Sequence, residues 1–344
     1  MSFEKLVIFY FSGTGNSKNV AQWMALAASK KNIECTIYNI ASIERGSVVP
    51  VPKDSLVVFV SPVHGFNYPP VVLNFIARFP RGKNKVILMN TRAGILIGKF
   101  NLPGISGVSF LISSLILKLK GYSIAGLKSV DLPSNWMSLH PGLNEKTVLF
   151  LHKKHKSEVL DFAEKIFSGQ KVYVSLFEFI IDILVAPISI GYYLAGRFIL
   201  AKTFYASADC NNCDLCIKNC PVKAIIKIDN RPFWTFKCES CMRCISNCPK
   251  RGIEVAHGFI LSFFLYASAL TGLFFYYFNS LFFVIPEGII GSVVETLLFL
   301  LMLGISYRII HYLMRFKFFE RLMVYTSLTK YKFWGKRYKA LKDF

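Results

Sequence analysis

The feature that most constrains this chain of 344 residues is a pair of identical cysteine runs in its second half. Eight of the nine cysteines fall in these runs, and each run has the spacing Cys-x2-Cys-x2-Cys-x3-Cys followed by Pro. The first run holds Cys210, Cys213, Cys216 and Cys220, and the second repeats it at a constant offset with Cys238, Cys241, Cys244 and Cys248. Such dense clustering is typical of metal ligation, whereas structural disulfides are characteristic of small secreted chains.

The spacing within the runs predicts two 4Fe-4S clusters. Three closely spaced thiolates bind one cubane, and the fourth Cys of each run, which precedes Pro, binds the other cluster. This rule assigns one cluster to Cys210, Cys213, Cys216 and Cys248, and the other to Cys238, Cys241, Cys244 and Cys220. A zinc site would be expected to combine two separated Cys pairs, often with His, but neither run contains His.

Residues 204–256 resemble the bacterial two-cluster ferredoxins. The resemblance rests on the two runs and on the paired segments that follow them, residues 221–226 and 249–255. It implies a small α+β domain that carries electrons one at a time. Cys35 lies far from both runs on a predicted strand, and we interpret it as a small buried side chain.

Residues 1–170 have a different pattern, in which short apolar runs alternate with amphipathic stretches. The predicted strands are residues 6–11, 33–38, 56–60, 85–89 and 122–130, and the predicted helices are residues 16–31, 70–79, 108–120 and 145–167. Such alternation predicts an α/β fold with a doubly wound parallel sheet. Ligands of these folds bind at the carboxyl ends of the strands.

The first predicted strand leads into a glycine-rich loop, Ser12-Gly13-Thr14-Gly15-Asn16-Ser17. The glycines allow a tight turn, the next helix directs its positive N-terminal end at the same place, and the hydroxyls add donors. The loop therefore predicts a phosphate site, with an ordinary strand-to-helix turn as the alternative. It is not a dinucleotide fingerprint, because Lys18 stands in place of the third glycine, and it lacks the Gly-Lys-Ser/Thr of a P-loop.

This loop resembles the FMN-phosphate loop of the flavodoxin family, which implies a flavodoxin-like domain that binds FMN. In that family, the loops after the third and fourth strands lie beside the flavin ring. The residues that the resemblance places there are Pro62, Val63, His64, Gly65, Phe66 and Tyr68, followed by Thr91 and Arg92. We expect Phe66 or Tyr68 to stack on the ring and His64 to be a packing residue. Arg92 is either a cation that favours the anionic reduced flavin or a solvated loop residue.

Two apolar runs, residues 259–285 and 289–310, predict a transmembrane hairpin. Each exceeds the roughly 20 residues that a helix needs to cross a bilayer, and only Pro286, Glu287 and Gly288 separate them. The hairpin accounts for much of the mean hydropathy of +0.43. Lys and Arg flank its outer ends and are absent from its tip, so the positive-inside rule places both ends in the cytoplasm. Glu295 is interpreted as a hydrated residue near the tip, with a proton or quinone role as the alternative.

Two further segments bear on membrane contact. From Arg308 onward, ten Lys and Arg residues face two acids and are interleaved with aromatic residues, which predicts a surface for anionic headgroups and disfavours a nucleic-acid role beside two spans. Residues 176–201 are apolar but contain Glu178, Asp182, Pro187 and Arg197. We interpret them as a packed or interfacial helix pair, with a third span as the alternative.

The sequence therefore predicts five segments. These are a flavodoxin-like domain (1–170), a helical linker (171–203), a ferredoxin-like domain (204–256), a transmembrane hairpin (257–312) and a basic aromatic tail (313–344). Over residues 5–255 the order resembles bacterial and archaeal flavodoxin–ferredoxin fusion proteins.

That resemblance implies an electron-transfer flavoprotein, here anchored to the cell membrane with its redox domains on the cytoplasmic face. Its partner is expected to be a redox protein or a quinone. One alternative is a terminal reductase of a quinone or small substrate at the flavin. Another is a non-enzymatic redox sensor or assembly subunit with a vestigial flavin site.

Overall fold

Two units are distinguished in the computed structural model, which describes residues 4–44, 47, 49, 51–97, 100–281, 288–335 and 337–341. The first unit combines residues 1–135 and 142–192 with 336–344 at the C-terminus. The second combines residues 136–141 with 193–335. The predicted basic tail is thus divided between the two units.

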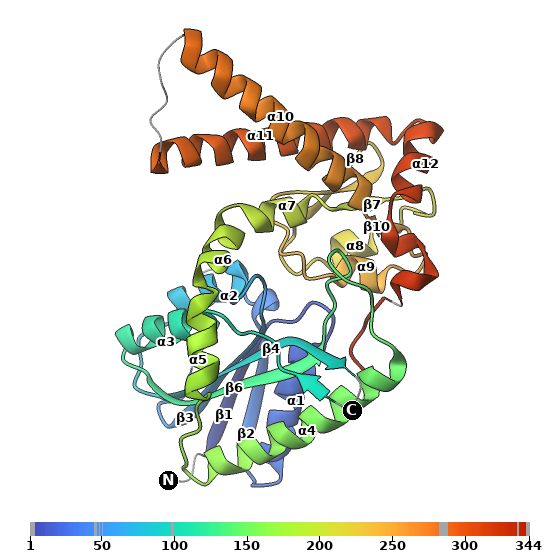
Figure 1. Cartoon of the computed structure of the whole chain (residues 1–344). Coiled ribbons are helices and arrows are strands. Elements are labelled where there is room, and N and C mark those ends of the chain that lie inside the picture. The colour runs from blue at the N-terminus through green and yellow to red at the C-terminus, as the bar shows by residue number, and fades with distance from the viewer. Residues whose placement is uncertain are drawn as a thin grey trace. The chain divides into compact units, whose positions relative to one another are not determined.

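A parallel sheet of five strands forms the centre of the first unit (Figure 1). Its strands are β1 (Lys5–Tyr10), β2 (Glu34–Asn39), β3 (Ser55–Pro62), β4 (Lys85–Ile97) and β6 (Ser123–Pro133). Their order is β2-β1-β3-β4-β6, and the short β5 (Phe100–Leu102) pairs antiparallel with the end of β4. This is the flavodoxin-like order of doubly wound sheets, so the predicted α/β fold class is confirmed for this unit.

Helices cover both faces of the sheet. On one face lie α1 (Asn16–Ser29) and α4 (Glu145–Phe167), and on the other lie α2 (Pro70–Arg78) and α3 (Ser109–Leu119). A short 3-10 turn, Ile40–Ser42, follows β2. Because both faces are covered, β3 is apolar along most of its length and buried from Ser55 to Ser61.

Two strands are longer than the sequence pattern predicts. β4 continues through residues 90–94, which were expected to form a loop, and pairs there with the end of β6, from Asn90 opposite Ser129 to Gly94 opposite Pro133. The prediction of a loop was wrong because the polar residues Asn90, Thr91 and Arg92 are buried within the strand. Its side chains form a buried polar network, in which Asn90 bonds Ser109 and Arg92 bonds Asp131.

The second unit contains a structural duplication that follows the cysteine runs. One repeat is β7 (Phe204–Ala206), α8 (Leu215–Lys218) and β8 (Ile225–Ile228), and the other is β9 (Arg231–Trp234), α9 (Arg243–Asn247) and β10 (Ile253–Val255). The strands pair across the repeats, β7 with β10 and β8 with β9, both antiparallel. The two repeats are therefore related as the halves of a pseudo-symmetric domain.

The backbone itself repeats at the offset that relates the two cysteine runs. Left-handed residues recur as Asn212 and Ser240, Asp214 and Met242, and Lys223 and Arg251. The amide of Cys210 donates to Ser207 O at 3.1 Å, and that of Cys238 donates to Thr235 O at 3.1 Å. Since non-glycine residues seldom adopt positive φ, this recurrence shows that both runs fold into the same loop.

Two long apolar helices follow, α10 (His257–Leu281) and α11 (Ile289–Leu313). Residues 257–278 and 290–313 are long and apolar enough to cross a membrane, judged by length and composition. The helices pack through Phe263 and Phe299, whose ring centroids lie 4.9 Å apart. Of the predicted tip, Pro286 and Glu287 lie outside the described residues. Glu295 is exposed in the second turn of α11.

The linker forms α5 (Leu176–Leu184), α6 (Ala186–Gly191), a π-helical segment (Tyr192–Gly196) and α7 (Arg197–Ala201). Residues 176–184 and 186–201 meet at a bend of 49°. By length and composition, together they could also form a broken membrane span or a re-entrant loop. However, Asp182 of α5 accepts hydrogen bonds from the amides of Ser106 and Gly107 at 3.0 and 2.7 Å. α5 is therefore packed on the first unit, as the linker interpretation expects.

The segment after α11 is folded rather than extended along its whole length. It contains α12 (Lys317–Tyr325) and two 3-10 turns, Leu328–Lys330 and Lys332–Trp334. In the second unit Met323 packs with Tyr205, and Thr329 bonds Glu254. Phe318 and Phe333 remain about 70% exposed. Much of the predicted tail is thus structural, and exposed aromatic side chains are left for contact with other surfaces.

Candidate functional site

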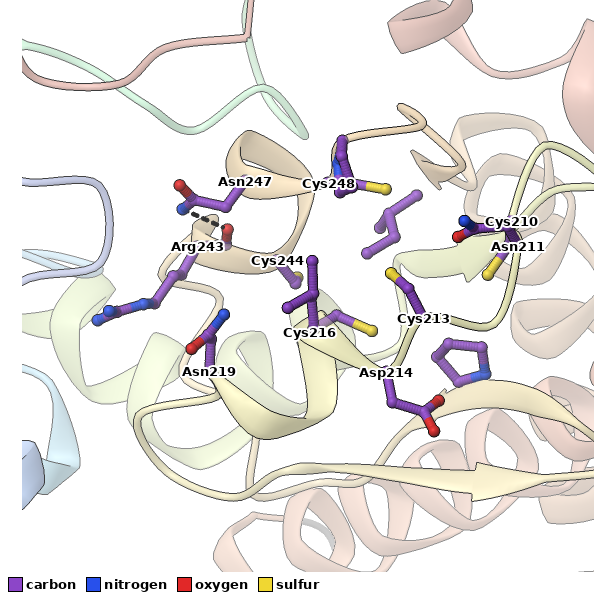
Figure 2. A pocket seen from close by; sticks show the side chains of 14 residues that line it. Cys210, Asn211, Cys213, Asp214, Cys216, Asn219, Arg243, Cys244, Asn247 and Cys248 are labelled. Atoms are coloured by element: carbon purple, nitrogen blue, oxygen red, sulfur yellow. Dashed lines mark hydrogen bonds between the residues drawn. The ribbon is translucent and has the colours of Figure 1, made fainter.

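The first cysteine set lines a single pocket in the second unit (Figure 2). Cys210, Cys213 and Cys216 from the first run meet Cys248 from the second, and Cys244 lies at the pocket edge. The structure therefore brings together the four residues that the spacing assigns to one cluster. The fourth cysteine crosses between repeats because the pseudo-symmetric pairing places each run beside the end of the other.

The other set is also gathered, and it is more deeply buried. Burial raises the pKa of the Cys238 thiol, and the neighbouring Cys241 and Cys220 raise it further. The pKa of Cys244 is likewise raised by burial and then by Cys238 and Cys241. These mutual effects place Cys220, Cys238, Cys241 and Cys244 near one another.

Hydrogen-bond donors surround both sets. The amide of Ala224 donates to Cys220 Sγ at 3.2 Å, and the amide of Ser240 donates to Cys238 Sγ at 3.4 Å. In the cysteine-containing repeats, the buried donors Trp234 Nε1, Ser240 Oγ and Ser246 Oγ have no hydrogen-bond partner among the described residues. The Trp234 indole is nevertheless close enough to Cys244 to favour its thiolate. Unpaired buried donors are costly, and sulfide or thiolate acceptors would satisfy them.

The thiols are not arranged around a single point. In the described part of the chain, no group of three or more His, Cys, Asp or Glu side chains could hold one metal ion. Zinc requires such convergence, since its four ligands bind one atom. A cubane distributes four thiolates over different iron atoms.

The glycine-rich loop of the first unit turns directly into α1. Gly15, with φ of 115°, directly precedes α1, whose first amides have no partner within the helix. Ser12 Oγ accepts from the Gly15 amide at 3.0 Å, and Ser17 Oγ lies 2.9 Å from Thr91 Oγ1. The loop after β1 and the end region of β4 are thus brought together, as the resemblance implied. Helix N-terminal amides and hydroxyls at this edge suit a phosphate.

The C-terminal segment of the first unit, residues 337–341, lies on this loop. The amide of Ala340 donates to Thr14 O at 2.9 Å, and Asn19 Nδ2 donates to Leu341 O at 2.9 Å. A Cβ at Gly15 would lie 2.7 Å from Ala340 Cβ, so glycine is needed here for both its φ and the close approach. Sequence reasoning missed this contact, because these residues carry no pattern that points to the loop.

The loop after β3 makes a tight turn from His64 to Asn67. Gly65 and Phe66 both have positive φ, and the His64 amide donates to Asn67 O at 2.8 Å. The ring of Tyr192 lies over Gly65, where a Cβ would come within 2.0 Å of it. His64 is buried, and Phe66 is half-buried. Tyr68 is fully buried and donates its hydroxyl to Met89 O at 2.9 Å, so its ring belongs to the core and not to a stacking surface.

Arg92 is neither a solvated residue nor a free cation. It is 8% exposed, its Nε donates to Asp131 Oδ1 at 2.8 Å, and its Nη1 bonds Ser106 and Glu178. Two carboxylates therefore more than balance its charge. The alternative that Arg92 is a solvated loop residue was wrong, because the sequence pattern did not reveal Asp131 and Glu178 as its partners.

Comparisons with known proteins extend to the fold of the first unit alone. No protein-family model matches the chain, and no curated protein matches it. Flavodoxin 1 from Bacillus cereus is similar over 48% of this chain and 98% of its own, with 15% identity and a TM-score of 0.35. Fusobacterium nucleatum flavodoxin bound to flavin mononucleotide covers 47% of this chain and 98% of its own, with 13% identity and a TM-score of 0.32.

A further similar structure, rubredoxin oxygen:oxidoreductase from Desulfovibrio gigas, is matched over 49% of this chain and 38% of its own, with 15% identity and a TM-score of 0.30. These scores are low. The flavodoxin-like fold is therefore assigned from the strand order and parallel register of the sheet itself.

Proposed function

We propose that this protein is a membrane-bound iron–sulfur flavoprotein that transfers electrons between FMN, two 4Fe-4S clusters and a membrane or protein partner. The observation that carries the proposal is the duplicated cysteine loop. Its backbone conformation repeats, and its thiols gather in two sets that mix both runs. The proposed ligands are Cys210, Cys213, Cys216 and Cys248 for one cluster, and Cys220, Cys238, Cys241 and Cys244 for the other.

The proposal of FMN is supported by the phosphate loop and the flavodoxin-like strand order. Residues 12–17 would hold the phosphate through backbone amides and the hydroxyls of Ser12, Thr14 and Ser17. Phe66 is the aromatic residue left beside the proposed ring position, since Tyr68 is buried. When bound, FMN exchanges electrons singly or in pairs, whereas each cluster exchanges one, so together they convert two-electron to one-electron transfer.

The residues of the chain have distinct tasks in this scheme. The buried walls around the second cysteine set exclude water, and amides such as that of Ser240 stabilise negative charge on sulfur. The Arg92–Asp131–Glu178 network fixes the edge of the sheet beside the loop without adding net positive charge. No side chain is assigned to proton transfer.

The membrane assignment rests on α10 and α11. Their outward side chains are apolar and well exposed, for example Leu265 at 70% and Leu297 at 61%. Exposed apolar stripes on helices of this length suit lipid. With basic residues at both outer ends, we propose that the redox domains face the cytoplasm.

The test is anaerobic purification from membranes with cofactor analysis. The proposal expects about eight iron atoms and eight sulfides per chain, together with one FMN. It also expects two one-electron clusters by electron paramagnetic resonance. Protein that retains neither iron nor flavin after anaerobic isolation would rule the proposal out.

A second candidate is a redox sensor or assembly subunit that has lost its flavin. It is favoured by one observation, the Tyr192 ring over Gly65 in the loop that would meet the flavin. This candidate predicts full iron and sulfide content but no FMN. It further predicts that Tyr192→Ala does not recover FMN binding, whereas a ring that merely shields a functional site would allow tighter binding once removed.

A further inference from the structure

A lysine is buried without a carboxylate partner beside the second cysteine set. Lys202 is 2% exposed, and its Nζ donates to the carbonyl of Trp234 at 2.6 Å. Among the described residues, no Asp or Glu forms an ion pair with it. An unpaired buried ammonium is rare because its lost hydration is costly. Something else must stabilise this charge.

Part of the stabilisation comes from an aromatic cage. The ammonium lies 4.6 Å from the ring centroid of Phe233, 4.3 Å from that of Phe236 and 4.6 Å from that of Tyr307. Each aromatic face attracts a cation. Tyr307 is itself fixed by its hydroxyl, which donates to Phe204 O at 2.7 Å. The cage is therefore rigid and shaped for a positive charge.

The remaining neighbour with the right sign is the cysteine set, since Phe236 of the cage lies only two residues before Cys238. Burial lowers the pKa of Lys202 to about 8, and the thiolate of Cys238 acts in the opposite direction. A set of four thiolates around an oxidised cubane carries about two negative charges, and one further electron raises this to three. A fixed cation nearby is stabilised by that charge, and the reduced state is stabilised more than the oxidised state.

The duplication shows that this arrangement belongs to one cluster only. At the offset that relates the two cysteine runs, Lys202 corresponds to Asn230, which is exposed, and Trp234 corresponds to Ala206. Near the other set, Arg243 lines the pocket but is only half-buried, and Lys227 is half-exposed and already paired with Asp214 at 2.9 Å. The two repeats share a backbone but differ in buried charge.

We propose that Lys202 is the buried countercharge of the cluster held by Cys220, Cys238, Cys241 and Cys244, and that it raises the reduction potential of this cluster above that of its pseudo-symmetric partner. The inference rests on the proposed function. It makes this cluster the one that collects electrons, and Tyr307 of α11 forms one wall of the aromatic cage around its countercharge. Lys202 is a positioning residue, since it acts on the potential and ligates nothing.

The test is a redox titration of the detergent-solubilised holoprotein with dithionite, followed by electron paramagnetic resonance. Lys202→Gln keeps a hydrogen-bond donor for Trp234 O but removes the charge. We expect the reduction equilibrium of one cluster to fall at least tenfold, which corresponds to about 59 mV for one electron. The other cluster should shift much less. Lys202→Arg should retain the wild-type potential if it is accommodated, because it keeps the charge.

The matched control is Lys237→Gln. Lys237 precedes Cys238 in sequence but is exposed, so solvent screens its charge and little shift is expected. Equal shifts in the two variants, or no shift in Lys202→Gln with both clusters present, would overturn the inference. If Lys202→Gln fails to assemble, Lys202→Met supplies a second neutral variant, and loss of its cluster with retention in Lys202→Arg supports the role. Wild-type protein without iron would instead refute the proposed function, and the inference with it.

Discussion

Arg92 shows how a buried charge can be structural at the edge of a candidate ligand site. It bonds Asp131 through two nitrogens and Glu178 through a third, and Gly104 N also donates to Asp131 Oδ1 at 2.7 Å. Neutralising Asp131 breaks the ion pair in which both side chains are less than 10% exposed, and it leaves Arg92 with Glu178, whose side chain is 26% exposed, as its carboxylate partner. Breaking such a pair typically costs about 3–5 kcal/mol, whereas an exposed pair is worth about 0–1 kcal/mol.

We therefore expect Asp131→Asn to lower the first thermal transition of the detergent-solubilised protein by several degrees. The matched control is Glu34→Gln, which removes the exposed partner of Lys5 at 3.1 Å. Its effect should be close to nil. Differential scanning calorimetry provides the measurement, and comparable small shifts in both variants would contradict a stabilising role for the Arg92 network.

In the proposed ligand sets, Cys220 and Cys248 each bind the cluster of the other run, and this assignment can be tested by substitution. Cys213→Ala and Cys248→Ala lie in different runs but should abolish the same cluster, leaving about four iron atoms. Cys220→Ala should abolish the other one. Cys35→Ala is the control, since Cys35 lies on β2 of the first unit and belongs to neither run, and about eight iron atoms should remain. Iron analysis with electron paramagnetic resonance distinguishes the sets. If Cys248→Ala and Cys220→Ala remove the same signal, the crossed assignment is wrong.

The spacing of the cysteines predicted most directly which side chains would lie together. The two runs fold alike, because their spacing encodes a local loop that each run can form by itself. Arg92, Tyr68 and Lys202 could not be placed in this way. Their surroundings depend on partners that are distant in sequence, such as Met89 for Tyr68 and Trp234 for Lys202.

At the scale of elements, residues 337–341 and α4 form a pH-sensitive contact. Tyr338 OH lies 2.8 Å from His152 Nε2 and also bonds Asn16 of the phosphate loop. Burial and, to a smaller extent, the nearby His155 lower the pKa of His152 to about 4. Because an exposed His has a pKa near 6.5, protonation favours release. The docked state is fully stabilised above about pH 6.5 and loses stability as the pH falls towards 4.

Hydrogen–deuterium exchange of residues 337–341, corrected for the intrinsic pH dependence, should therefore show less protection at pH 5 than at pH 7.5. Tyr338→Phe should reduce protection at pH 7.5, since it removes the hydroxyl that His152 and Asn16 share. Protection that does not change between these pH values would show that His152 does not control this contact.

Helices and strands were predicted correctly where the hydrophobic periodicity of the sequence is strong. They were missed or shortened where polar residues are buried. The apolar cores of β1 and β3 gave clear strands, since both faces are covered by helices. The extension of β4 through Asn90, Thr91 and Arg92 was not predicted, because polar residues at a strand end look like a loop until their buried partners are known. The folding of α12 on the second unit was missed for a similar reason, since contacts such as that of Thr329 with Glu254 are distant in sequence.

At the scale of the whole molecule, the net charge of +21 and the apolar hairpin together determine which side of the membrane each part of the chain is expected to occupy. Thiolates, clusters and FMN phosphate would offset part of this charge. The basic residues near both outer ends of α10 and α11 would remain and would hold those ends on the cytoplasmic side. If so, the region around Gly288 lies on the opposite side.

An epitope inserted after Gly288 tests this orientation, because a Cβ at that position would meet nothing within 4 Å and the residue is exposed. We expect antibody to bind this epitope from the outer face of the cell membrane, in spheroplasts with an intact membrane. An epitope in the second unit at Asn230, in the exposed turn between β8 and β9, should be detected only after permeabilisation. Detection of both epitopes only after permeabilisation would mean that the hairpin does not cross, and detection of Asn230 alone in intact spheroplasts would reverse the orientation. Iron content measured on both tagged proteins controls for correct folding, since the insertion at Gly288 is far in sequence from every cysteine.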